Sequence, residues 1–142
     1  VLRLIGACGV TLTFMVVVVL LGPMQVSKGQ SYFTLFGGTL FFFHFLNPVL
    51  SFLSIVFLTP GKKFNSLAWL LAMSTTFIYS WVYTANVLSG NWTDFYNLTF
   101  GGKYFLIPID ILLLNGVTFG FGVLLSFLRN LFNSRLGEKV QK

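Results

Sequence analysis

The chain has 142 residues, of which 56% are hydrophobic and only 8% are charged, and its mean hydropathy is +0.85. A water-soluble domain cannot bury this much apolar surface, so the composition indicates a membrane protein. The net charge of +6 comes from basic residues between the apolar runs and in the tail, where such residues set membrane orientation, and we therefore exclude nucleic-acid binding.

Four apolar runs, each near the length that crosses a bilayer as a helix, follow one another along the chain. We expect an all-α, polytopic transmembrane bundle that forms one domain over 1–142, with a polar cytoplasmic tail over 129–142. Pro23 is expected to end the first span, and the pair Gly37-Gly38 to bend or delay the second. The predicted spans are 4–22, 33–58, 66–88 and 106–128.

The distribution of Lys and Arg predicts that both termini are cytoplasmic, because short loops rich in these residues stay on that side. Seven of them lie on one side of the predicted spans: Arg3, Lys62, Lys63, Arg129, Arg135, Lys139 and Lys142. The other side has only Lys28 and Lys103. The segments 24–32 and 89–104 are therefore predicted to face outward.

Polar residues inside the apolar runs are the candidates for function, since an unsatisfied polar group in hydrocarbon costs several kcal/mol. On the second span they share one helical face: Gly37, His44, Asn47, Ser51 and Ser54. The third span repeats the pattern with Thr76, Tyr79 or Ser80, and Tyr83, and the fourth contributes Asp110, Asn115 and Thr118. From the helical rise, His44, Tyr83 and Asp110 are predicted to lie in one layer below the outer surface.

Three roles remain open for His44: a hydrogen bond that joins helices, a general base or proton carrier, or a metal ligand. A single His without an acidic cluster does not build a conventional metal site, so we expect no metal and no cofactor. Asp110 either reaches the headgroups or has a functional role, in which the imidazole pairs with it. Pro48 is expected to kink the helix beside His44.

A Gly-x-x-x-Gly spacing on the fourth span, Gly116 to Gly120, predicts close approach of another helix. We assign it a structural role and no chemistry.

Four segments carry a family resemblance: 40–58 with His44 and Asn47-Pro48, Pro60-Gly61-Lys62-Lys63, Tyr83, and Gly90-Asn91-Trp92. In these segments the chain resembles the bacterial six-conserved-proline membrane proteins and their eukaryotic relatives, the androgen-induced and androgen-dependent TFPI-regulating proteins. The resemblance implies six helices with both termini cytoplasmic, of which the four spans here are the last four. We therefore expect an N-terminally truncated protein of the bacterial plasma membrane.

The eukaryotic members of that family are intramembrane threonine hydrolases that cleave fatty acid esters of hydroxy fatty acids. The family His, followed four residues later by a Pro, matches His44 and Pro48. By the same alignment the family threonine falls upstream of Val1, and the loop after Trp92 lacks the family's Tyr-Pro pattern. The nucleophile is therefore not identified in this chain.

These observations lead to three functional hypotheses. The first is hydrolysis of a lipid ester with His44 as the base and with Asn47, Tyr79, Tyr83 and Asp110 around the ligand. The second is a transporter or channel in which His44 and Asp110 relay protons, and the third is a scaffold without catalysis. The expected partners are membrane lipids and a lipid-like ligand. The oligomeric state is left open.

Overall fold

The structure, a computed structural model, describes residues 1–59 and 63–140, without the side chains of 134–140. Every regular element within these residues is a helix, which confirms the all-α prediction. Within the described part of the chain, three helices are long and apolar enough to cross a membrane: Leu2–Ser27, Thr39–Phe57 and Tyr104–Asn133. Pro60, Gly61 and Lys62, which belong to the segments that carry the family resemblance, lie outside the described residues, as does Lys142.

The first membrane-length helix continues past the proline that was predicted to end it. It consists of α1 (Leu2–Val16), a π-helical segment η1 (Val17–Leu21) and α2 (Gly22–Ser27). Proline is tolerated there because the preceding turn is π-helical and the carbonyl of Val18, which Pro23 cannot serve, accepts a hydrogen bond from the hydroxyl of Tyr32 at 2.8 Å. The predicted end at Pro23 is therefore wrong, and the helix ends at Ser27.

The second membrane-length helix begins after a glycine break, as predicted. A 3-10 segment, η2 (Tyr32–Phe36), is separated from α3 (Thr39–Phe41) by Gly37 and Gly38. Gly38 has φ of 55°, a conformation that glycine adopts without steric cost. The helix then passes through a second π-helical segment, η3 (Phe42–Leu46), into α4 (Asn47–Phe57).

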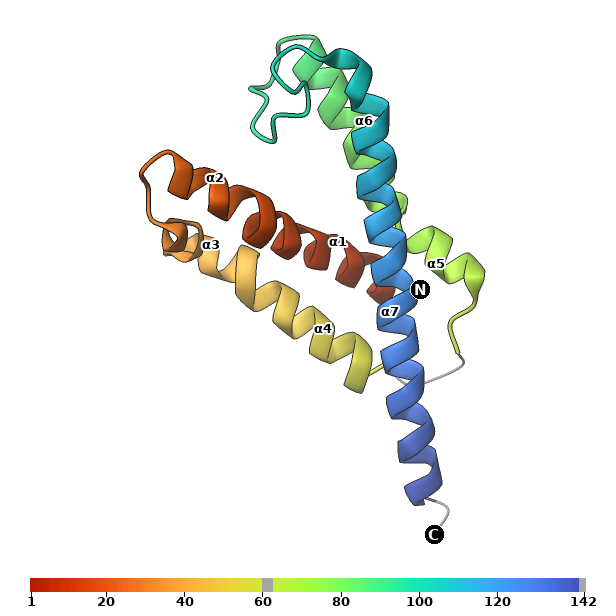
Figure 1. Cartoon of the computed structure of the whole chain (residues 1–142). Coiled ribbons are helices and arrows are strands. Elements are labelled where there is room, and N and C mark those ends of the chain that lie inside the picture. Colours follow the sequence, from red (N-terminus) through yellow and green to blue (C-terminus); the bar gives the residue numbers. More distant parts are fainter. Residues whose placement is uncertain (60–62, 141–142) are drawn as a thin grey trace.

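The third predicted span is divided in two. Asn65 caps α5 (Ser66–Ala72), its side chain accepting a hydrogen bond from the backbone N–H of Ala68 at 3.1 Å. After a turn at Met73, α6 (Ser74–Leu88) takes a different direction, which Figure 1 shows clearly. A 3-10 turn, η4 (Tyr104–Leu106), leads from the following loop into the long α7 (Ile107–Val140).

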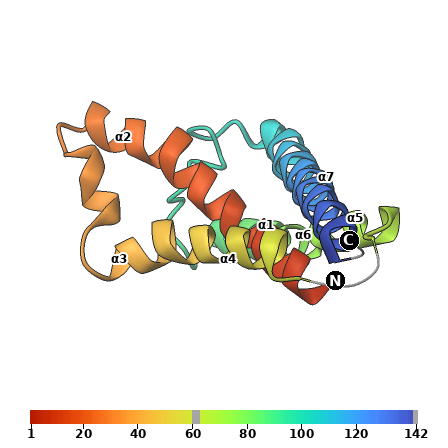
Figure 2. The same cartoon turned by 90° about the horizontal axis from the view of Figure 1, so that it is seen from below.

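The helices form two antiparallel hairpins that meet at one end and diverge at the other (Figure 1). One hairpin pairs α1–α2 with α3–α4, and both views show these arms side by side (Figure 2). The other pairs α6 with α7. Where they meet, small and branched side chains of α1, α4, α5 and α7 form the main core: Leu4, Ala7, Cys8, Ile55, Val56, Ala68, Ala72 and Leu125.

Arginine side chains fasten the end where the hairpins meet. Arg129, only 1% exposed, donates from Nε to the carbonyl of Thr59 at 3.0 Å and lies over the ring of Phe64. Arg3 donates from Nη1 to the carbonyl of Leu58 at 3.2 Å. These carbonyls follow the last turn of α4, where no further helical N–H reaches them. Arg129, at which the polar tail was predicted to begin, is therefore part of the packed structure.

Close helix approach on α7 occurs at a glycine other than the predicted pair. A Cβ added at Gly122 would lie 3.1 Å from the Cβ of Ala72 on α5. A Cβ added at Gly116 or Gly120 would meet nothing within 4 Å in the described part of the chain, and both residues are exposed. The expectation that Gly116 and Gly120 pack against another helix of this chain is therefore wrong, because they face away from it.

Candidate functional site

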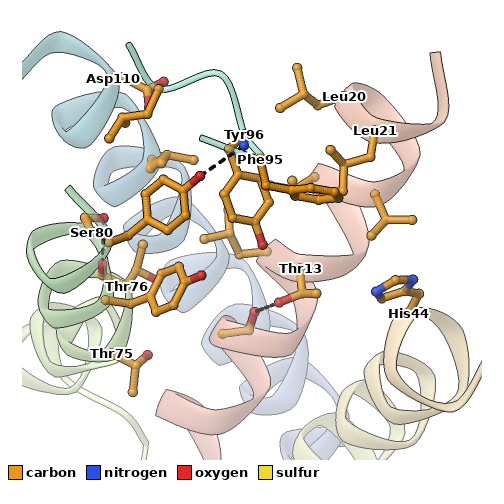
Figure 3. Close-up of a pocket in the computed structure, with 18 of the residues that line it drawn as sticks. Thr13, Leu20, Leu21, His44, Thr75, Thr76, Ser80, Phe95, Tyr96 and Asp110 are labelled. Carbon is orange, nitrogen blue, oxygen red and sulfur yellow. Dashed lines mark hydrogen bonds between the residues drawn. The ribbon is translucent and has the colours of Figure 1, made fainter. Parts of the chain in front are cut away.

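A partly open cavity of about 770 Å³ lies between the two hairpins, on the side where they diverge. One wall is α1 and η1, and the facing wall is α6 with the loop after it (Figure 3). Most of the lining is apolar, with hydroxyl, imidazole and carboxyl groups set into it. The lining residues are Gly9, Leu12, Thr13, Val16, Val17, Leu20, Leu21, Leu35, Leu40, His44, Thr75, Thr76, Tyr79, Ser80, Tyr83, Phe95, Tyr96, Leu98, Asp110 and Leu114.

Four of the five predicted site residues line this cavity: His44, Tyr79, Tyr83 and Asp110. Asn47 does not, and it is exposed. The π-helical η3 accounts for the difference, because a π-helical turn holds more residues than an α-helical one and so changes the angle between His44 and Asn47. The predicted face shared by His44 and Asn47 is therefore broken between them.

The imidazole of His44 is held by a backbone carbonyl. Its Nδ1 lies 2.7 Å from the carbonyl oxygen of Leu35. Leu35 belongs to η2, which precedes the glycine break. A carbonyl only accepts hydrogen bonds, so Nδ1 carries the proton and the neutral ring has its lone pair on Nε2. The hydrogen bond ties the helix to the η2 segment before the glycine break and leaves one nitrogen available as a base.

His44 and Asp110 do not form the pair that was expected. Figure 3 shows them on opposite sides of the cavity, on η3 and α7, with Phe95 and Tyr96 between them. The carboxylate of Asp110 lies in the first turn of α7, where the helix dipole favours a negative charge. The two residues therefore share a cavity without direct contact.

The hydroxyl of Tyr83 is occupied by the loop that follows α6. It donates to Oδ1 of Asp94 at 3.3 Å and accepts from the backbone N–H of Tyr96 at 3.1 Å. The ring of Tyr83 packs with Leu98, Ile107 and Ile111. Tyr83 therefore presents its ring to the cavity, while its hydroxyl orders the loop.

Asp94 organises the same loop through three further hydrogen bonds. Its Oδ1 accepts from the N–H of Leu98, and its Oδ2 accepts from the N–H and the hydroxyl of Thr99, all at 2.7 to 2.8 Å. Burial raises the pKa of this carboxyl, but the hydrogen bonds from Thr99, Leu98 and Tyr83 outweigh burial and leave the pKa below its ordinary value. The loop therefore depends on an ionised Asp94.

Tyr96 joins the two hairpins across the cavity mouth. It packs against the cluster of Val17, Leu21 and Leu35 in one hairpin and against the cluster around Tyr83 in the other. Burial raises the pKa of Tyr96 to about 12, so its hydroxyl stays protonated. Nothing in the sequence spacing of Tyr96 indicates this tertiary contact.

The choice of polar residues inside the apolar runs as candidates also missed the wall of the cavity that α1 forms. Gly9 permits close approach to α6, since a Cβ added there would lie 3.5 Å from Oγ1 of Thr75. Thr13 donates its hydroxyl to the carbonyl of Gly9 at 3.1 Å (Figure 3). The signal that could have found this wall is the small-residue face that Gly9 and Thr13 share.

A scan against protein-family models and searches of curated proteins and of solved structures gave no match to this chain. The resemblance to the six-conserved-proline membrane proteins therefore stays a prediction.

Proposed function

We propose that this protein binds an amphipathic, lipid-like molecule in the cavity between its two hairpins. The observation that supports this best is the composition of the walls. Leu12, Val16 and Leu20 provide an apolar strip on α1 and η1 for a hydrocarbon chain, and Tyr79 and Asp110 provide polar groups on the facing helices. A largely apolar cavity with few polar groups is typical of a small-molecule site.

We also propose four membrane spans with both termini in the cytoplasm. The broken helix α5–α6 then crosses together with the three longer helices. The basic residues Arg3 and Arg129 at the end where the hairpins meet support a cytoplasmic position for that end. The cavity then opens in the outer half of the membrane, where an amphiphile can enter from the lipid.

The binding proposal is tested by narrowing the cavity. Thr13→Phe places a ring in the cavity, whereas Val19→Phe adds the same ring at a position that is 63% exposed and outside the lining. Energy transfer from tryptophan to a pyrene-labelled fatty alcohol, measured in neutral-lipid nanodiscs, reports saturable binding. We expect Thr13→Phe to abolish the saturable signal and Val19→Phe to retain it. Equal binding by both variants contradicts the proposal.

A second candidate, hydrolysis of a lipid ester, is favoured by one observation. The hydrogen bond from Nδ1 of His44 to Leu35 leaves Nε2 as a proton acceptor on a residue that lines the cavity. Three threonines also line it, Thr13, Thr75 and Thr76, and each is a hydroxyl that a base would have to activate. The family resemblance supplies the reaction, and His44 is the proposed base.

A fluorophosphonate probe distinguishes the two candidates. If the protein is a hydrolase, the probe labels wild type and the His44→Ala variant loses the label. His44→Asn is the matched control for folding, because its amide can still donate to the Leu35 carbonyl while lacking a base. Absence of labelling in wild type, with pyrene-alcohol binding intact, contradicts the hydrolase and leaves the binding protein.

A further inference from the structure

The charge of the cavity points to the head group of its ligand. Of the lining residues, all of which belong to the described part of the chain, Asp110 is the only one with a carboxyl group, and none is Lys or Arg. The neighbouring carboxylate of Asp94 is already satisfied by backbone and hydroxyl donors. A carboxylate in a cavity lined by no Lys or Arg repels an anionic head group and attracts a cationic one.

Asp110 itself has no partner of opposite charge. Its carboxylate makes no hydrogen bond or ion pair with any residue that the structure describes. The residue is half-buried and belongs to the α7 side of the cavity lining (Figure 3). A half-buried carboxylate gains most from a partner that brings a positive charge and little need for strong hydration.

Aromatic rings lie in the same part of the cavity. The ring centroids of Tyr83 and Tyr96 are 5.2 Å apart, those of Tyr79 and Tyr83 are 5.9 Å apart, and those of Phe95 and Tyr96 are 5.3 Å apart. All four rings belong to the lining. The faces of such rings attract cations, and clusters of them recognise quaternary ammonium groups.

From this arrangement we infer that the cavity selects amphiphiles with an ammonium head group, held between Asp110 and the rings of Tyr79, Tyr83, Phe95 and Tyr96. The hydrocarbon chain then lies along the α1 wall. This inference rests on the proposed binding function and adds the class of ligand. It also explains why Tyr83 contributes a ring and not a hydroxyl, since the hydroxyl is held by the loop.

The test compares three doxyl-labelled probes of equal chain length that end in a trimethylammonium group, a methyl ester or a carboxylate. Electron paramagnetic resonance in neutral maltoside micelles measures the immobilised fraction of each. We expect wild type to bind the ammonium probe on the order of tenfold more tightly than the ester, which corresponds to ~1.4 kcal/mol. The carboxylate probe should bind most weakly.

Variants at one position separate the possible outcomes. Asp110→Asn should reduce ammonium binding to the level of the ester, and circular dichroism of the same sample shows whether the variant is folded. Asp110→Glu should keep the preference for ammonium. Equal binding of ammonium and ester by wild type, or an unchanged preference in Asp110→Asn, overturns the inference while leaving amphiphile binding intact. Failure of all three probes to be immobilised overturns the proposed function itself.

Discussion

At the scale of single residues, the tightest requirement for a small side chain is at Gly22. A Cβ at this position would fall 2.1 Å from Cε2 of Tyr32, so the tyrosine ring occupies the space that any larger residue needs. The hydroxyl of the same tyrosine donates to the carbonyl of Val18 at 2.8 Å, which prevents the ring from moving away freely. The sequence shows Gly22 only as the residue before a proline, and its contact with Tyr32 is a tertiary feature.

We predict that Gly22→Ala lowers the free energy of unfolding by about 1–3 kcal/mol, because the ring and α2 must shift to admit the methyl group. The matched control is Gly120→Ala, where an added Cβ meets nothing within 4 Å and alanine favours the helix. Thermal unfolding in detergent, followed by circular dichroism, measures both. Equal melting temperatures for the two variants would show that Tyr32 does not pack as described.

The loop carboxylate Asp94 provides a prediction on pH. Its pKa in the folded protein lies below the ordinary value of 3.8, so the ionised form is the one that the fold stabilises. This contribution is complete above the ordinary pKa and is lost as the pH falls through the lowered one. Hydrogen exchange of the Leu98 and Thr99 amides, corrected for its intrinsic pH dependence, should therefore lose protection below pH 3.8.

Asp94→Asn should lose most of that protection already at neutral pH, because an amide has one accepting oxygen where the carboxylate has two. The amides of α7 near Asn115 serve as the internal control and should exchange as in wild type. Protection of Leu98 and Thr99 that is independent of pH in the wild type would refute the role of the carboxylate.

At the scale of elements, both prolines in the first hairpin follow a π-helical segment. The segments Val17–Leu21 and Phe42–Leu46 each end two residues before a proline, Pro23 or Pro48. In the first, the N–H of Gly22 donates to Val17, so the carbonyl of Val18 loses its α-helical donor, and Pro23 has no N–H to replace it. Tyr32 supplies the missing donor. By the same reasoning the carbonyl of Phe43 loses both helical donors beside His44.

A double-mutant cycle tests this compensation. Tyr32→Phe removes the donor and should cost about 1–3 kcal/mol, since the Val18 carbonyl is left unpaired in apolar surroundings. In a Pro23→Ala background the new N–H can reach that carbonyl, so the cost of Tyr32→Phe should be smaller by roughly 1 kcal/mol. Strictly additive effects in the cycle would show that Tyr32 and the proline do not act on the same carbonyl.

The sequence could predict that Pro48 disturbs its helix but not the form of the disturbance. A missing N–H can lead either to a sharp bend or to a π-helical turn. The structure has the π-helical turn, and Asn47 after it is exposed and outside the cavity lining. The break at Met73 was not predicted because no proline or glycine marks it. Its only local sign is the run Ser74-Thr75-Thr76, whose hydroxyls compete for backbone hydrogen bonds.

At the scale of the whole molecule, the hydrophobic pattern of the sequence predicts that the protein is helical but does not predict how its helices pack. Hydropathy locates membrane-length segments because the bilayer imposes the same requirement on each of them. Which faces meet depends on shape, and so Gly122 packs on α5 while Gly116 and Gly120 face outward. His44, Tyr83 and Asp110, predicted to share one layer, line one cavity without direct contact between His44 and Asp110, and their common depth in the membrane stays a prediction.

The central claim is that an amphiphile occupies the space between the hairpins, and photo-crosslinking in nanodiscs tests it directly. A fatty alcohol with a diazirine on its chain would be irradiated with the protein, and the labelled peptides mapped by mass spectrometry. We predict that labelling of Leu12 to Leu20 and of Thr75 to Tyr83 is competed by excess unlabelled fatty alcohol, while labelling of the exposed Leu124 and Phe127 on α7 is not. Labelling that competes equally at both sets of positions, or at neither, would contradict a ligand-binding cavity.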